Sequence, residues 1–108
     1  MGKELMKGFV NILILLILTK KDSYGYEISK YIKDKSNEKY ILKDGTLYPA
    51  LKRLELKGLI NSYWEEVDYV RKRKYYKISD LGKNFLDENL EIIKDIINLL
   101  NNFQEGLK

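Results

Sequence analysis

The chain contains neither cysteine nor histidine. Without cysteine it has no disulfide framework and no thiolate metal site, as expected of a protein in a reducing cytosol. Without histidine it lacks the nucleophile–histidine pairs of many hydrolases, mixed His/Cys zinc sites, and the one side chain that titrates near neutral pH unaided. No acid pair or glycine-rich phosphate loop suggests another chemistry. The sequence therefore predicts a protein that is not an enzyme, with no catalytic residue, no metal site and no cofactor.

Long apolar runs and prolines are also scarce. The most hydrophobic run, Ile12–Leu18, is seven residues long, well short of the roughly 20 needed to cross a bilayer. It predicts a buried helix with no membrane contact, and the polar Thr19–Asp22 after it offers no small-residue site for signal cleavage. A single proline and no Pro/Gly/Ser-rich linker leave no obvious domain boundary.

The excess of positive charge is small. Against 16 acidic residues stand 20 basic ones, a net charge of +4 over 108 residues. This balance favours an anionic partner without identifying one. The length fits one compact domain with one accessory element.

The expected helices come first along the chain. We expect a helix over residues 4–19 that is apolar nearly all round, and a second one, capped by Ser23, that ends near residue 35. A third helix begins near Asp44 or Thr46 and ends at Gly58, which suits a left-handed C-terminal cap. Pro49 belongs in a first helical turn and so favours the later start.

Two strands and a last helix follow. Residues 59–66 and 73–78 are rich in aromatic and β-branched side chains and predict a hairpin around a turn at 68–72. Ser79 caps a helix over residues 80–103. The fold class is therefore mainly α with a small β-hairpin: a winged helix-turn-helix domain plus a C-terminal helix.

The third helix has two faces. At about 100° per residue, Leu47, Leu51 and Leu54 form one buried stripe, and the opposite face has little core to cover. In a winged helix this third helix lies in the DNA major groove, where exposed donors contact base edges and phosphates. A solvated helix surface with no partner is the alternative interpretation. The DNA-contact candidates on this helix are Lys43, Thr46, Tyr48, Pro49, Lys52 and Arg53.

The hairpin carries a concentrated basic run. Five cations lie within Arg71–Lys77, and cations at the tip of a wing are suited to phosphate contact, which dominates affinity for DNA. The alternative is an edge strand that uses charge against aggregation. The DNA-contact candidates of the hairpin are Arg71, Lys72, Arg73 and Lys74.

The last helix has more apolar surface than one domain needs. One row has heptad spacing and predicts a dimer interface formed by Leu86, Leu90, Ile93, Ile97 and Leu100. A second row lies roughly 110° away by the same wheel and comprises Ile92, Ile96, Leu99 and Phe103. One row can pack on the first helix and the other on a second subunit; which row faces the partner is open, as is the alternative of a single amphipathic helix.

Four segments resemble the successive signatures of PadR-type regulators. They are GYEI at 25–28, DGTLYPALKRLE at 44–55, GLI at 58–60 and RKYYKISDLG at 73–82. The resemblance covers about residues 5–103 and is to the short members of the family, which end in one C-terminal helix. It implies a DNA-binding domain over residues 1–79 and a dimerisation helix over 80–108.

The resemblance also implies a function. PadR-type regulators are cytoplasmic homodimers that bind double-stranded DNA, usually as repressors, and often release it when a small hydrophobic effector binds. In some short members aromatic side chains line an effector site between the C-terminal helices, whereas Leu90–Ile97 here is aliphatic. The wing turn Val67–Val70 departs from the polar, glycine-containing wings of the family, so Tyr69 and Val70 are expected to insert into some surface instead of remaining in solvent. A winged-helix protein-interaction module that does not bind DNA is the alternative function.

Overall fold

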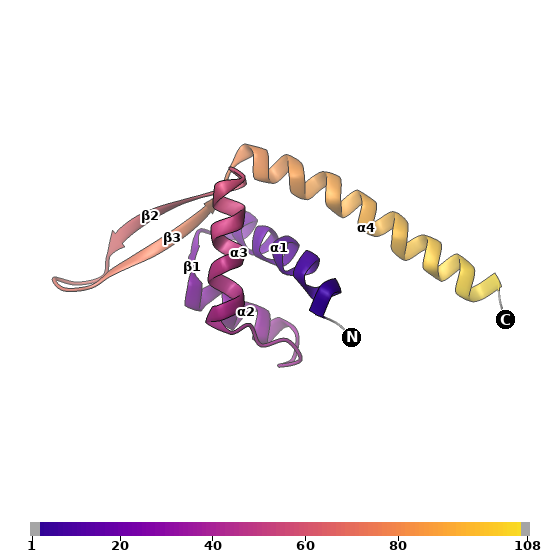
Figure 1. The fold of residues 1–108 in the computed structure, drawn as a ribbon, viewed down its shortest axis with the longest axis horizontal. Coiled ribbons are helices and arrows are strands. Elements are labelled where there is room, and N and C mark those ends of the chain that lie inside the picture. Colours follow the sequence, from indigo (N-terminus) through magenta and orange to yellow (C-terminus); the bar gives the residue numbers. More distant parts are fainter. Residues whose placement is uncertain (1–2, 107–108) are drawn as a thin grey trace.

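The computed structural model describes the backbone of residues 3–106 and the side chains of residues 8–106. Residues 1–2 and 107–108, the ends of the two predicted domains, lie outside the described residues. The elements follow in the order α1 (Lys3–Lys20), β1 (Ser23–Tyr24), α2 (Gly25–Lys35), α3 (Asp44–Leu56), β2 (Ile60–Glu66), β3 (Lys72–Ile78) and α4 (Asp80–Gly106). The predicted fold class, a winged helix-turn-helix with a long C-terminal helix, is confirmed (Figure 1).

Helix α1 lies at the centre of the core. Ile14 and Leu15 are completely buried, and α2, α3, β3 and α4 all contact this helix. A helix that is apolar nearly all round must be covered on most sides, and these four neighbours cover it. They contribute most of the other buried apolar side chains: Ile28, Ile32, Leu47, Ala50, Leu51, Leu54, Tyr76, Ile78 and Leu86. Leu59 and Ile60, at the start of the hairpin, complete the core.

Two residues set the corners on either side of the hairpin. Gly58 adopts a left-handed conformation, φ +75°, at the end of α3, where a side chain would be strained. The Ser79 hydroxyl accepts the Gly82 amide at 3.0 Å and donates to the Gly58 carbonyl at 2.7 Å. The predicted cap of α4 is confirmed, and the same side chain ties the start of α4 to the end of α3.

The hairpin belongs to a three-stranded antiparallel sheet in the order β1-β3-β2. The two long strands pair from Ile60 opposite Ile78 to Glu66 opposite Lys72. The predicted hairpin is confirmed, but the third strand is a correction. Ser23, expected to cap α2, is instead 2% exposed and pairs with Tyr76 in β1. The cap position falls on Tyr24, whose amide donates to Glu27 Oε1 at 3.3 Å.

The start of α3 is a second correction. The helix begins at Asp44, the earlier of the two expected starts, and Pro49 lies in its second turn. The first turn closes because the amides of Thr46 and Leu47 both donate to the Lys43 carbonyl at 2.9 Å. Pro49 lacks an amide hydrogen and therefore removes one bond, the one to the Gly45 carbonyl, from a helix that has already formed its first turn.

The wing and α4 project from opposite sides of the body (Figure 1). The radius of gyration is 16.1 Å and the extents are 63 × 30 × 21 Å, against the roughly 13 Å expected for a compact chain of this length. Within residues 3–106, no helix has both the length and the apolar character that crossing a membrane requires.

Gly82 provides a test of the corner between the hairpin and α4. A Cβ at this position would collide with the Leu59 carbonyl and lie 2.9 Å from Ile78 Cγ1. We expect Gly82→Ala to lower the free energy of unfolding by about 2 kcal/mol, because the backbone cannot move away without opening the corner. Urea denaturation measures the change.

The matched control for this substitution is Gly8→Ala. Gly8 is a helical glycine in α1 with no atom within 4 Å of an added Cβ. Alanine there should leave stability unchanged or raise it by up to about 1 kcal/mol. Equal effects of the two substitutions would contradict the packing described at the corner.

Candidate nucleic-acid interface

Helix α3 presents its outer face to solvent. Leu47, Ala50, Leu51 and Leu54 are buried, between 0% and 2% exposed, and fix the rotation of the helix about its axis. All six candidates predicted on this helix are therefore exposed: Lys43, Thr46, Tyr48, Pro49, Lys52 and Arg53. The predicted buried stripe is confirmed; the DNA contacts stay a prediction.

An aromatic cluster fixes the root of the wing to the start of α2. The Tyr63 ring stacks on Tyr75 with centroids 5.8 Å apart, and Tyr75 meets the edge of Tyr24 at 5.4 Å. The Arg73 guanidinium lies 4.3 Å from the centroid of the Tyr24 ring, a cation–π contact. These contacts hold the wing at a set angle to the helices.

A hydrogen bond ties the same cluster to the loop before β1. The Tyr63 hydroxyl donates to Asp22 Oδ2 at 2.6 Å. This bond is the largest cause that raises the pKa of Tyr63 to about 12, because ionisation would remove the donor and place a phenolate beside a carboxylate. Tyr63 therefore remains a neutral donor throughout the physiological range.

A cleft of about 500 Å³ separates the first half of α3 from the wing. The structure brings together two groups of predicted residues here, Tyr48 from α3 and Arg73 and Lys74 from the wing. An added Cβ on Gly25 would collide with the Tyr48 hydroxyl, so this glycine lets α2 approach α3 closely. The arrangement places hydroxyl donors and cations along one concave surface, a composition suited to a phosphate backbone.

Trp64 lines the same cleft and was missed by the sequence analysis. Its side chain is 65% exposed, and it stands opposite Lys74 across the hairpin. The pairing of the two strands could have indicated its location. Trp64 is directly opposite the predicted contact Lys74, and directly opposed residues of an antiparallel pair share a face.

The cations of the wing are less available than the sequence suggests. Arg71 Nη2 lies 2.9 Å from Asp68 Oδ2, and Lys74 Nζ lies 3.9 Å from Glu55 Oε1. Glu55 also accepts a short hydrogen bond from the Ser62 hydroxyl. Lys72 and Arg73 stand opposite Glu66 and Glu65 in the β2–β3 register. Each of the four predicted wing contacts therefore has an acidic neighbour, and the net charge of the outer wing is close to zero.

Comparison with known proteins identifies the family. Residues 14–88 match the family described as "Transcriptional regulator PadR-like family". The chain belongs to this family. Its members are transcriptional regulators and not enzymes, and the resemblance in the sequence is confirmed.

Relatives of this PadR-like chain include solved structures. A transcriptional regulator from Clostridium thermocellum is 38% identical with a TM-score of 0.86, covering 95% of this chain and 97% of that one. Bacillus subtilis PadR, solved in complex with operator DNA, is 29% identical with a TM-score of 0.70, covering 76% of this chain and 45% of that one. "Transcriptional regulator YqjI" of Escherichia coli is 33% identical over 89 residues, 82% of this chain. The match spans 41% of YqjI, so both PadR and YqjI are more than twice as long as the part they share with this chain.

Helix α4 of the PadR-like chain divides its apolar rows between core and solvent. Of the predicted interface row, Leu86 is 3% exposed within the chain's own core, and Leu90 and Ile93 pack partly against that core. Leu86 is therefore removed from the predicted dimer interface. Ile97 and Leu100 are 51% and 62% exposed. The second row is exposed along its whole length: Ile92, Ile96, Leu99 and Phe103.

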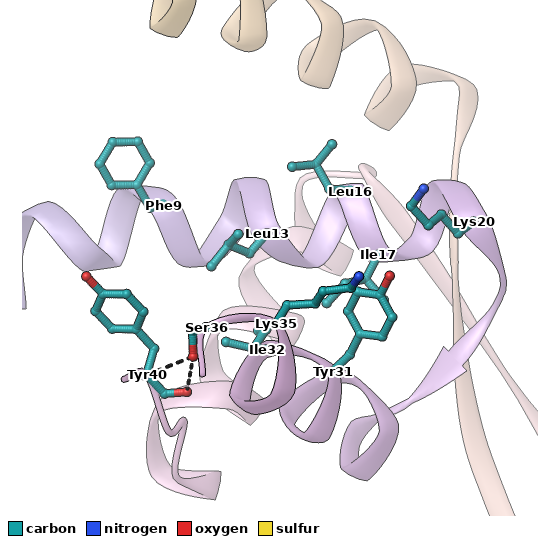
Figure 2. A pocket seen from close by; sticks show the side chains of 10 residues that line it. All are labelled: Phe9, Leu13, Leu16, Ile17, Lys20, Tyr31, Ile32, Lys35, Ser36 and Tyr40. Atoms are coloured by element: carbon teal, nitrogen blue, oxygen red, sulfur yellow. Dashed lines mark hydrogen bonds between the residues drawn. The ribbon is translucent and has the colours of Figure 1, made fainter. Parts of the chain in front are cut away.

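The body has a second hollow, an apolar groove between α1 and α2 with a volume of about 590 Å³ (Figure 2). Leu13, Leu16 and Ile32 form part of its lining, and Tyr40 contributes its ring from the loop after α2. The hydroxyl of Ser36 accepts the Tyr40 amide at 3.1 Å and holds that loop in place. Two cations, Lys20 and Lys35, lie along the groove.

Proposed function

We propose that this protein is a sequence-specific, DNA-binding transcriptional regulator of the bacterial cytoplasm that acts as a homodimer, as a repressor. In this proposal residues 1–79 are the DNA-binding domain and residues 80–108 the dimerisation helix. The observation that carries it is the face of α3: a helix pinned by four buried side chains presents polar and basic groups next to a wing. The relative from Bacillus subtilis was solved in complex with operator DNA, and this supports DNA binding by the present chain.

In this proposal the two parts of the interface, α3 and the wing, have separate tasks. Helix α3 enters the major groove, which is wide enough for a helix, and Thr46, Lys52 and Arg53 along its exposed face contact base edges and phosphates. Tyr48 and the cleft beside it receive the phosphate backbone. The wing lies over the adjacent groove, held there by the aromatic cluster at its root.

The effector is the remaining part of the proposal. The segment of α4 predicted to line an effector site, Leu90–Ile97, carries Ile92, Ile93, Ile96 and Ile97. Aliphatic side chains of this kind favour an aliphatic compound over a flat aromatic one. Such a compound would release DNA if it bound better to a subunit arrangement whose α3 helices no longer match the groove spacing.

Lys52 and Arg53 allow the DNA-binding function to be tested. We expect Lys52→Ala/Arg53→Ala to weaken binding by about 10- to 100-fold and to reduce the slope of log affinity against log salt by about 2. The measurement is a fluorescence-anisotropy titration with the duplex upstream of the protein's own coding region, repeated at several salt concentrations.

The control variant is Lys83→Ala/Lys94→Ala, which removes the same charge from α4. It should bind as the wild type does. If the wild type shows no salt-dependent affinity for any duplex, the protein is a winged-helix protein-interaction module instead. Unchanged binding by the Lys52→Ala/Arg53→Ala variant would remove α3 from the interface.

The homodimer is supported by two matching surfaces. The row Ile92, Ile96, Leu99 and Phe103 is about half exposed or more, from 49% to 63%, too much contiguous apolar surface for a monomer. By helical position Glu88 and Asp95 flank this row. The groove between α1 and α2 has an apolar lining flanked by Lys20 and Lys35 (Figure 2). In the proposed dimer, this row of one subunit therefore packs in the groove of the other.

The dimer contact is tested by adding charge to that row. Ile96→Asp/Leu99→Asp should yield a monomer of 12.8 kDa, because two carboxylates cannot be buried unpaired in an apolar groove. Light scattering coupled to size exclusion measures the mass.

The matched control is Asn98→Asp/Asn102→Asp, which adds the same charge to the polar side of α4 and should remain a dimer. A dimeric Ile96→Asp/Leu99→Asp variant with native helicity by circular dichroism would contradict the proposed contact.

A further inference from the structure

The tip of the wing is apolar and points away from the body. Tyr69 is 107% exposed, Val70 is 89% exposed and Val67 is 39% exposed. The turn between β2 and β3 lies at the far end of the hairpin from the helices (Figure 1), and none of these three side chains belongs to the buried core. An exposed aromatic ring beside an exposed valine indicates a surface that is buried in a complex.

The turn that carries these residues is firmly held. One Asp68 oxygen accepts the amides of Val70 and Arg71 at 3.0 and 2.9 Å, and the other accepts Arg71 Nε at 3.0 Å. These hydrogen bonds also hold the pKa of Asp68 below its usual value. The Val67 amide closes the turn on the Arg71 carbonyl at 2.9 Å. Tyr69 is therefore presented by a turn that needs little further ordering on binding.

The charges around the tip point to the kind of contact it makes. Arg71 is committed to Asp68, and Lys72 and Arg73 stand opposite Glu66 and Glu65. A wing whose cations are balanced in this way gains little from counterion release. Its contribution to binding has to come mainly from another source, and the exposed apolar tip offers one.

The reach of the hairpin identifies the partner surface. Each strand has seven residues, a length of about 20 Å. The major groove is about 12 Å wide and the minor groove about 6 Å. With α3 in a major groove, a hairpin of this length crosses the intervening phosphate backbone and places its tip at the next minor groove. Apolar wedges are known to enter that groove and to unstack a base step.

We propose that Tyr69 and Val70 enter the minor groove of the operator as an apolar wedge, so that the tip of the wing contributes affinity by packing on sugars and bases, while phosphate contact belongs to the cleft beside α3. This inference rests on the proposed DNA-binding function. It predicts a preference for base steps that unstack easily at the flanks of the site, where α3 makes no contact.

The test separates apolar contact from charge. We expect Tyr69→Ser/Val70→Ser to bind the duplex recognised by the wild type about tenfold more weakly or worse, with an unchanged salt slope, because no cation is removed. Tyr69→Phe, which keeps the ring and loses only the hydroxyl, should retain wild-type affinity. 2-Aminopurine placed at successive flanking steps should brighten on binding of the wild type, through unstacking, and not on binding of the serine variant.

Three outcomes would overturn the proposal. Wild-type affinity in the serine variant would leave the DNA-binding function standing and exclude the wedge. A loss of affinity in Tyr69→Phe equal to that of Tyr69→Ser/Val70→Ser would assign the contact to the hydroxyl. A variant that becomes monomeric in light scattering would place the tip in a protein interface. Absence of duplex binding by the wild type would instead overturn the proposed function on which the wedge rests.

Discussion

Helix α1 is apolar on nearly every side, and no single neighbour can cover a helix of that kind. Helix α2, helix α3, strand β3 and helix α4 each take one side of it. Since each neighbour has to turn its own apolar side inward, the direction of its outer face is fixed as well. The orientation of α3 follows from this constraint, because Leu47, Leu51 and Leu54 can reach the core in one rotation only.

The same constraint separates the two surfaces on which the proposed function depends. The outer face of α3 and the wing lie on one side of the body, and the far half of α4 leaves it on another (Figure 1). A partner helix bound in the groove between α1 and α2 would contact α1, the helix on which α3 packs. In the proposed dimer, a change in how the subunits pack would therefore reach the outer face of α3 through one shared helix.

The sequence predicts those features that depend on local chemistry. Gly58 and Ser79 were identified as caps because a left-handed turn and a helix N-terminus each select few residue types. Helical periodicity predicted the buried stripe of α3, because the spacing of apolar residues within one helix is also a local signal. Local signals failed at β1, a two-residue strand whose pairing with Tyr75 and Tyr76 depends on residues about 50 positions away.

The candidate interface was predictable in position but not in its electrostatics. The basic run at Arg71–Lys74 is visible in the sequence, whereas its acidic partners are distributed over β2, the turn and α3 and meet it only in the folded chain. Leu86 shows the same limit, because heptad spacing cannot tell whether an apolar residue faces its own core or a second subunit.

In the proposed dimer, two α3 helices lie in successive major grooves of one duplex. Hydroxyl-radical footprinting on the duplex upstream of its own coding region measures this most directly. We expect two protected patches on one face of the duplex, about 10 base pairs apart, with further protection of the minor groove outside each patch. A single patch, or uniform weak protection along the duplex, would contradict it.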